Sequence, residues 1–278
     1  MRRWTQPLLI AAAVGITCSA STSIIAQTLP VRVNRWLELR QTSGSVVYVR
    51  GSRTQPARTG FRLQAVGDGL RTGARARATL ALDTQIGFVQ VSENTDLQIT
   101  ELRTTRNGGR VTEITVNRGQ ARLQARPFTV PDTELNIRTP AGVSGVRGTI
   151  FGVSVQPGGR TGVATEEGNV ETSAQGQSVN VPAGFQSMIV PGEPPTPPMP
   201  LTNDPSLNLS ILRAVDDTTV EIIGRVDPLN LLLIEDAVQT LDRSGEFNLR
   251  LPLPADRRIQ ALVTTPLGQQ QAYELVVP

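Results

Sequence analysis

The side chains that could do chemistry in this 278-residue chain are almost entirely arginines and carboxylates. Histidine and lysine are absent, all 27 basic residues are arginine, and Cys18 is the one cysteine. The sequence therefore offers no imidazole as a general base or metal ligand near neutral pH, and no lysine amine for a Schiff base. A single cysteine cannot close an internal disulfide, so stability must come from packing.

Several carboxylates occur as adjacent pairs, a spacing that does not suit acid–base catalysis. The pairs are Glu166-Glu167, Asp216-Asp217 and Glu235-Asp236. Neighbouring residues on a strand point to opposite faces, so the two members of a pair do not face one substrate. A calcium site at Asp216, Asp217 and Asp227 would lack the D-x-D-x-D-G spacing of calcium loops. We expect no enzyme activity, no catalytic residues, no metal site and no cofactor.

The arginines indicate a different kind of chemistry, which is contact with anions. Arg75 and Arg77 share one face of a segment, and Arg122 and Arg126 share one face of another. A guanidinium can bind a carboxylate or phosphate through two hydrogen bonds. These four residues are therefore candidate contacts for an acidic glycan or an envelope protein. The alternative, which the sequence favours, is a solvated strand face, because net charge bears on solubility and non-specific binding more than on a site.

The charge divides unevenly along the chain. Residues 28–190 hold 19 arginines against 12 acids, and residues 191–278 hold 6 arginines against 12 acids. Aromatic residues make up only 4% of the sequence, so few side chains are available to stack on nucleic acid bases. We therefore expect no nucleic-acid partner.

Short strands must position these side chains. The chain has 25 glycines and 20 prolines, which suits an all-β fold with many turns. Apolar alternation predicts a hairpin around Asp83-Thr84, and Asn107-Gly108 and Arg118-Gly119 are predicted turns. The regular turn spacing predicts a compact β sandwich or short β roll over residues 38–190.

A proline-rich segment follows this region. Residues 191–205 contain seven prolines, a composition that predicts an extended, semi-rigid linker between domains. Residues 206–278 show six or seven short apolar segments, which predict a small immunoglobulin-like sandwich.

The N-terminus has the features of an export signal. Arg2 and Arg3 precede a short apolar stretch and a small, polar region that ends near Ala26. We expect a signal peptide over residues 1–26, cleavage after Ala26, and location in the periplasm or at the cell surface. The mature chain would then have no stable membrane span. A retained N-terminal anchor and lipidation at Cys18 are the alternatives.

The stretch from Ile137 to Val155 is the most distinctive in the sequence. Glycines recur every third residue at Gly142, Gly145 and Gly148, which predicts bulges or close backbone approach. Apolar alternation then begins at Phe151 and predicts a half-buried strand. Arg147 lies within this apolar motif, so we expect it to be buried and paired with loop carbonyls or with a carboxylate such as Asp68.

This stretch and an upstream one resemble the FecR domain family, whose patterns run G-D-x-L-R-T-G-x-x-A and T-P-x-G-x-x-x-V-R-G-T-x-F-x-V. The matching residues are Gly67, Asp68, Leu70, Arg71, Thr72, Gly73 and Ala76 in the first, and Thr139, Pro140, Gly142, Val146, Arg147, Gly148, Thr149, Phe151 and Val153 in the second. The resemblance covers about residues 38–190, and its motif residues are interpreted as structural.

The resemblance implies a sensor or interaction role in the cell envelope. Well-known family members regulate sigma factors in iron-uptake signalling through a cytoplasmic helical region and a membrane helix, and this chain matches only the periplasmic module. We therefore expect a non-enzymatic binding or scaffold module. The alternative is a periplasmic sensor arm that acts through a separate membrane partner, and a carboxylate-dependent hydrolase is a third, disfavoured hypothesis.

Overall fold

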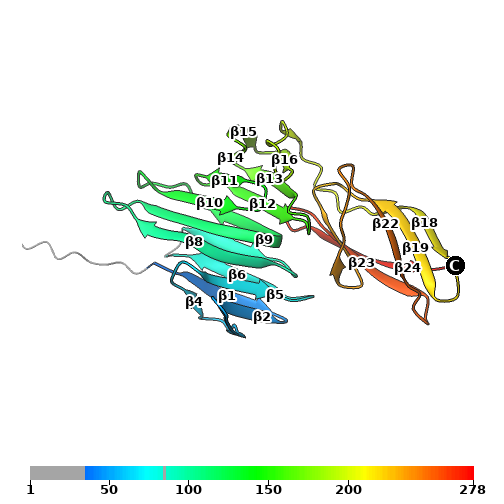
Figure 1. The fold of residues 1–278 in the computed structure, drawn as a ribbon. Helices are drawn as coiled ribbons and strands as arrows, with labels where there is room; N and C mark the ends of the chain where they lie inside the picture. The colour runs from blue at the N-terminus through cyan, green and yellow to red at the C-terminus, as the bar shows by residue number, and fades with distance from the viewer. Residues whose placement is uncertain (1–34, 84–85) are drawn as a thin grey trace, which may run out of the picture. The chain divides into compact units, whose positions relative to one another are not determined.

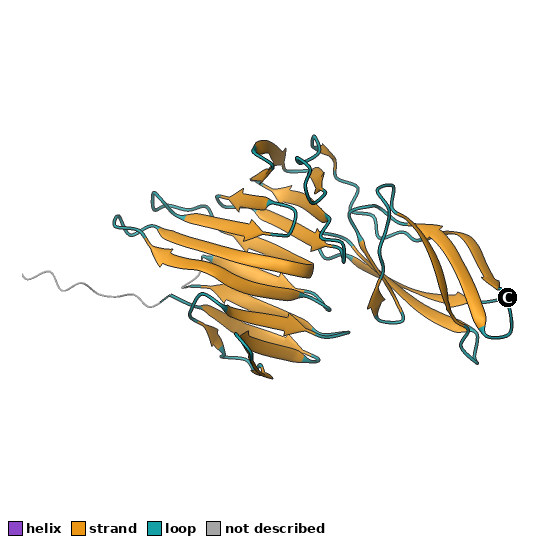
Figure 2. Cartoon of the chain, viewed as in Figure 1, coloured by secondary structure: helices purple, strands orange, loops and turns teal. Residues whose placement is uncertain are grey.

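Every regular element in the residues that the computed structural model describes is a β-strand (Figure 2). The structure describes residues 35–83 and 86–278. The all-β fold class is therefore confirmed. The expected signal peptide, its cleavage site after Ala26 and Cys18 lie outside the described residues. Within the described ranges, no helix has the length and apolar character needed to cross a membrane.

The first 17 strands form two layers that share one long strand, β9 (Arg110–Ala125). The chain alternates between the layers as it runs along the stack of strands (Figure 1). Layer A consists, in spatial order, of β4 (Arg62–Leu63), β1 (Leu37–Ser43), β6 (Arg77–Leu82), β7 (Gly87–Val91), the second half of β9, β12 (Ile150–Val155), β13 (Thr161–Glu167), β16 (Phe185–Ile189) and β17 (Met199–Pro200). Layer B consists of β3 (Arg53–Pro56), β2 (Val46–Arg50), β5 (Asp68–Thr72), β8 (Asp96–Thr104), the first half of β9, β10 (Glu134–Arg138), β11 (Val143–Val146), β14 (Asn169–Ala174) and β15 (Gln177–Pro182).

One hydrophobic cluster holds the two layers together. It takes alternate residues from each strand, such as Leu80 and Phe151 in layer A and Leu97 and Ile114 in layer B, all fully buried. Each such side chain contributes about 1.5–3 kcal/mol by leaving water. The alternation predicted after Phe151 is confirmed for the core face, since Val153 and Val155 lie in the same cluster. The expectation that this strand is half-buried is wrong, because Gly152 and Ser154 on its other face are buried as well.

Strand β9 corrects one expectation from the sequence. The turn predicted at Arg118-Gly119 is absent, and the strand continues through it with a register shift. Gly119 has a φ of +90°, and a Cβ there would lie 2.3 Å from the Thr95 hydroxyl oxygen. The glycine signal that marked a turn therefore marks a bulge, which redirects the strand from layer B into layer A. The hairpin predicted around Asp83 forms between β6 and β7.

The proline-rich segment 191–205 is not a free spacer over its whole length. Its β17 pairs with β16, and the Thr196 amide donates to the Met188 carbonyl at 2.9 Å. The Leu201 amide donates to the Gly184 carbonyl at 2.8 Å. Because proline has no N–H, only the residues between the prolines can donate these bonds. The segment thereby covers the edge of layer A.

The remaining strands form a C-terminal sandwich of two antiparallel sheets. A second hydrophobic cluster, with Ile222, Phe247 and Val263 among its members, fills it. Its immunoglobulin-like identity and the domain boundaries stay predictions. One sheet has β18 (Asn208–Ala214), β19 (Thr219–Arg225) and β22 (Glu246–Pro252), and the other has β21 (Ala237–Val238), β20 (Leu231–Ile234), β23 (Arg258–Thr264) and β24 (Gln270–Val276).

The bulge in β9 yields a stability prediction for Gly119→Ala. The control is Gly176→Ala, in the turn between β14 and β15. Gly176 has a φ of +72° and open space at its Cβ position, so this variant measures only the cost of the left-handed backbone, about 1–2 kcal/mol. Gly119→Ala should cost about 1–3 kcal/mol more, because its Cβ also meets Thr95. Urea unfolding of both variants measures the difference. Equal losses of unfolding free energy would contradict the close approach in β9.

Candidate functional site

The outer face of layer A meets the C-terminal sandwich in a close contact, which we call the seam. The seam joins β9, β12 and β13 to the loops 227–231, 241–242 and 265–268. A Cβ at Gly152 would lie 1.8 Å from the Pro266 carbonyl oxygen, and one at Gly162 would lie 2.6 Å from the Leu229 side chain. The backbones approach this closely because both positions lack side chains.

Buried polar side chains complete the seam. The Gln120 amide donates to the Pro266 carbonyl at 2.7 Å. The Gln156 amide donates to the carbonyls of Pro228 at 2.9 Å and Asn230 at 3.0 Å. These bonds satisfy loop carbonyls that the contact removes from water, so the seam is specific as well as tight.

Arg160 is the one arginine of the described residues that the seam buries. Its guanidinium donates to the carbonyls of Leu241, at 3.1 Å, and Asp242, and to the side-chain oxygen of Gln156. Burial lowers the pKa of Arg160 from its ordinary value. Since arginine stays charged well above neutral pH, this buried cation is held by carbonyl dipoles rather than by a carboxylate.

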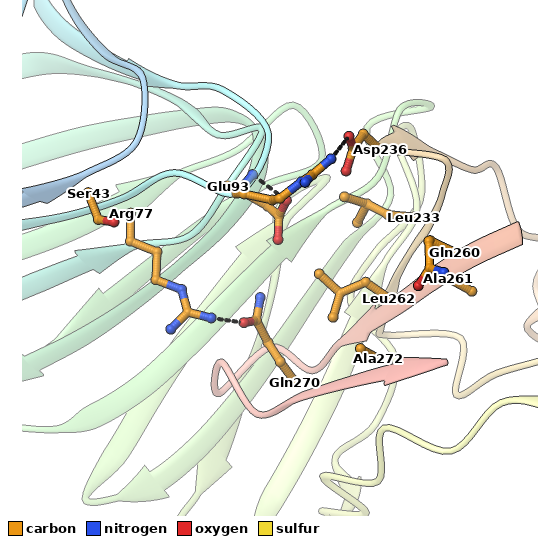
Figure 3. Close-up of a pocket in the computed structure, with 11 residues that line it drawn as sticks. Ser43, Arg77, Glu93, Leu233, Asp236, Gln260, Ala261, Leu262, Gln270 and Ala272 are labelled. Atoms are coloured by element: carbon orange, nitrogen blue, oxygen red, sulfur yellow. Dashed lines mark hydrogen bonds and ion pairs between the residues drawn. The ribbon is translucent and has the colours of Figure 1, made fainter. Parts of the chain in front are cut away.

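An open hollow of about 710 Å³ lies beside the seam, between the two parts of the chain. Figure 3 shows Arg77 reaching toward Gln270, with the side chains of Leu233 and Leu262 to the right of this pair. Arg75 forms an ion pair with Asp236 at 2.9 Å, and the hydrogen bond and charge of Asp236 raise the pKa of Arg75. The lining of the hollow thus holds two arginines, Arg75 and Arg77, and two carboxylates, Glu93 and Asp236, and the C-terminal sandwich adds the apolar side chains of Leu233 and Leu262.

The structure brings together three of the four arginines predicted to contact an anion. Arg77 and Gln270 also line a second, smaller hollow of about 230 Å³, which includes Arg122. Arg122 is paired with Glu166 at 2.6 Å. Arg126 is exposed and lines a different hollow, beside Arg110. Arg75, Arg77 and Arg122 therefore follow the seam, and Arg126 does not join them.

Asp68, the acidic residue of the upstream motif, is fully buried in a network of hydrogen bonds. Arg50 donates to both of its oxygens at 2.5 and 2.8 Å, and the Tyr48 hydroxyl donates at 2.8 Å. The backbone amides of Gln64 and Ala65 also donate to it. Burial acts to raise the pKa of Asp68, but these donors outweigh it and lower the pKa below its usual range.

The expected burial of Arg147 is wrong. Arg147 is exposed, and Arg50, not Arg147, pairs with Asp68. The reason is the alternation of β11, which points Val146 into the core and therefore the next residue outward. An arginine within an apolar motif thus marked the outer face of the layer.

Several of the other motif residues form local hydrogen bonds or lie in the core. Thr72 accepts from the Thr95 amide, Thr139 accepts from the Gly142 amide, and Phe151 is fully buried in the core. The remaining motif positions are placed as follows: Gly67 and Gly148 have positive φ, Gly73 donates to the Ser45 carbonyl, Arg71 pairs with Asp96, Thr149 is buried and Pro140 is exposed.

A family model connects these motifs to known proteins. The model described as FecR protein matches residues 68–171, which run from Asp68 in β5 to β14. Residues 68–171 are a FecR domain. The match lies inside the range 38–190 over which the sequence resembles the family. The family is of a signalling type.

Two crystal structures are similar to part of the chain. Both come from Parabacteroides distasonis ATCC 8503, at 2.50 and 1.65 Å resolution, and are provisionally described as an anti-sigma factor. They share 13% and 15% sequence identity with this chain, cover 48% of it, and have a TM-score of 0.40. The chain spans 59% of the length of each. No curated protein matches the chain.

The sequence signal for the seam was present but ambiguous. Gly152 and Ser154 alternate with the core residues of β12, and their partners on β13 are Ala164 and Gly162. Four small residues in one patch of a strand face allow another element to approach closely. On sequence alone, the same small residues would also suit a strand face exposed to water. The sequence therefore did not predict that the C-terminal sandwich covers this face.

The carboxylate pairs serve turns and ion pairs. Asp216 accepts from the Thr218 amide at 2.8 Å, Glu235 accepts from the Gln260 amide at 2.6 Å, and Asp236 pairs with Arg75. Glu166 pairs with Arg122. Among residues 35–83 and 86–278, no three His, Cys, Asp or Glu side chains are grouped as metal ligands would be.

Gly152 allows a direct test of the seam. Gly152→Ala should displace loop 265–268 from the FecR domain and cost about 2 kcal/mol or more, because its Cβ would overlap the Pro266 carbonyl. The matched control is Gly158→Ala, which has open space and no positive φ. Calorimetric unfolding and protease sensitivity of the C-terminal sandwich report the outcome. Identical melting of the two variants would contradict the contact.

Asp68 gives a pH prediction. Its folded-state pKa lies below the unfolded value of about 3.9, so its contribution to stability is present above that pH and is lost as pH falls through the folded pKa. Asp68→Asn should therefore lower stability at pH 7 and flatten the fall in stability below about pH 4. Urea unfolding between pH 2 and 7 measures this. Asp96→Asn, which breaks an exposed pair with Arg71, is the control and should change stability little.

Proposed function

We propose that this chain is a non-enzymatic binding and scaffold module of the cell envelope, and that its seam binds an acidic partner. The observation that carries the proposal is the hollow between the FecR domain and the C-terminal sandwich, where Arg75 and Arg77 lie beside the carboxylates Glu93 and Asp236 and Arg77 has no ion-pair partner among the described residues. Arg122 in the adjoining hollow extends the cationic surface along the seam. A linear anion, such as an acidic glycan, could contact all three.

The ion pairs along the seam can be exchanged for a ligand. Arg75 and Asp236 are both solvent-exposed, and such a pair contributes only about 0–1 kcal/mol. The pair of Arg122 with Glu166 is also partly exposed. Arg77 donates to the neutral amide of Gln270 and, within the described residues, has no carboxylate partner. Acidic groups of a ligand would therefore replace weak contacts.

The scaffold role rests on how the two parts are joined. The contacts of Gly152 and Arg160, together with the pairing of β17 on β16, hold the walls of the hollow in place. A preformed site loses less conformational entropy on binding. Within the adjacent carboxylate pairs, Asp216 and Glu235 accept hydrogen bonds from backbone amides and Glu166 pairs with Arg122, which supports a binding role over catalysis. Location in the envelope rests on the export signal expected from the sequence.

A second candidate function is a periplasmic sensor arm that acts through a separate membrane partner. The FecR match favours it, because the family is of a signalling type. Crosslinking of the exported protein in intact cells, followed by identification of its partner, separates the two. Capture of a membrane-spanning regulator would favour the sensor arm, and capture of envelope polymer would favour the scaffold.

The acidic-partner proposal predicts that binding depends on Arg77. Wild-type protein should bind polygalacturonate and not dextran, with affinity that falls as salt is raised. Arg77→Gln should weaken binding about threefold to fivefold, equivalent to about 0.7–1 kcal/mol for one exposed charge contact. Isothermal calorimetry at several salt concentrations measures both effects.

The matched control is Arg106→Gln. Arg106 is exposed in the turn between β8 and β9 and does not line either hollow along the seam. The Arg106→Gln variant removes the same charge as Arg77→Gln, so its binding reports the effect of net charge alone. If both variants weaken binding equally, the seam is not the site, and the net charge of the FecR domain accounts for the affinity.

A further inference from the structure

Gly145, in the centre of the FecR motif, has no structural reason to be glycine. Its φ lies outside the left-handed range, and a Cβ there would meet only the Asn136 side-chain oxygen, at 3.0 Å. Every other described glycine inside a strand would place its Cβ within 2.7 Å of a neighbouring atom; these are Gly69, Gly87, Gly119, Gly152, Gly162 and Gly224.

A glycine inside a strand has a cost that needs an explanation. It lacks a side chain to pack and loses more backbone entropy on folding than other residues. The neighbouring motif glycines have clear reasons, because Gly142 lies against the Ser173 carbonyl and Gly148 has a φ of +83°. Where neither conformation nor packing requires glycine, the close approach of a ligand is the remaining common cause.

The missing side chain leaves a hollow on the outer face of layer B. The hollow has a volume of about 400 Å³ and spans β10, β11, β14 and β15. Asn136, Gly145, Glu171 and Asn180 stand opposite one another in register, one on each strand. Arg147 lies at the end of β11 in the same hollow. Polar groups therefore repeat at the strand spacing of about 4.8 Å, with a gap at Gly145.

We propose that this hollow is a second binding site, and that it takes a hydroxyl-rich saccharide chain lying across the strands over Gly145. The site is separate from the seam, and the proposal does not depend on the one made for the seam.

The side chains fit hydroxyl groups better than ions. A hydroxyl donates one hydrogen bond and accepts two, and the lining offers both kinds of partner. Asn136 and Asn180 donate and accept, Glu171 accepts and Arg147 donates. With Glu134 included, the lining holds two carboxylates and one guanidinium, so it does not select a polyanion. Its only apolar residue is Val146, which points into the core, so an apolar segment of a protein has no surface to bury there.

The lining charges also remain available. In the part of the chain that the structure describes, Arg147, Glu134 and Glu171 form no ion pair, whereas the adjacent Arg138 and Glu113 pair through two bonds of 2.9 Å. Arg147, Glu134 and Glu171 can therefore orient toward a ligand without breaking an internal ion pair.

The test fills the gap at Gly145. Purified full-length protein is titrated with a panel of neutral oligosaccharides, including chitin and cellulose tetramers and maltotetraose, by isothermal calorimetry and by NMR. We expect at least one to bind, Gly145→Gln to weaken it at least tenfold, and Arg147→Met to weaken it severalfold. The matched control Val143→Gln places the same side chain two residues along the strand, outside the hollow, and should bind like wild type. Arg77→Gln should also leave this binding unchanged.

A stability readout distinguishes this site from architecture. Gly145→Ala should not lower the melting temperature, whereas Gly142→Ala should, because its Cβ would lie 2.5 Å from the Ser173 carbonyl oxygen. The proposal is overturned if no saccharide of the panel binds, or if Gly145→Gln and Val143→Gln bind equally well. A loss of melting temperature in Gly145→Ala equal to that in Gly142→Ala would also overturn it.

Discussion

The structure depends first on the bulge that lets β9 belong to two layers. The first half of β9 pairs with β8 and β10, and the second half pairs with β7 and β12. Between the halves the strand has a left-handed residue that lies close to the neighbouring chain, which is one of the geometries that form a β-bulge. Gly119 is this residue. The bend places the first half of β9 beside the Gly145 hollow and the second half, with Gln120 and Arg122, beside the seam.

The seam turns the outer face of a layer into a buried interface. Strand β12 presents apolar residues to the core and small or polar residues outward, and the C-terminal loops cover that outward side. Glycines permit the approach, and Gln156 and Arg160 supply the donors that buried carbonyls need. The same contact produces the hollow in which Arg75 and Arg77 lie, so the proposed binding surface follows from how the two parts are joined.

The glycines of the FecR domain fall into two groups that look alike in the sequence. Gly142 and Gly148 are fixed by backbone contacts and backbone conformation, whereas Gly145 is constrained by neither. Glycines at one regular spacing therefore serve two purposes: Gly142 and Gly148 allow the backbone to fold, and Gly145 leaves an open polar surface. Arg147 belongs to that surface for a simple reason: the residue after a core position on a strand points outward. A charged residue within an apolar motif is thus no guide to burial unless the strand register is known.

The sequence alone determined the all-β class, the core face of β12, the hairpin of β6 and β7, and the FecR motifs, because these follow from local alternation and turn chemistry. It could not distinguish the bulge at Gly119 from a turn, since a left-handed glycine is common in both. Only the tertiary structure decided the partner of Asp68, the exposure of Arg147, and the grouping of Arg75, Arg77 and Arg122 along the seam. These depend on which strands are neighbours and on what covers each outer face, and contacts between residues far apart in the sequence fix both.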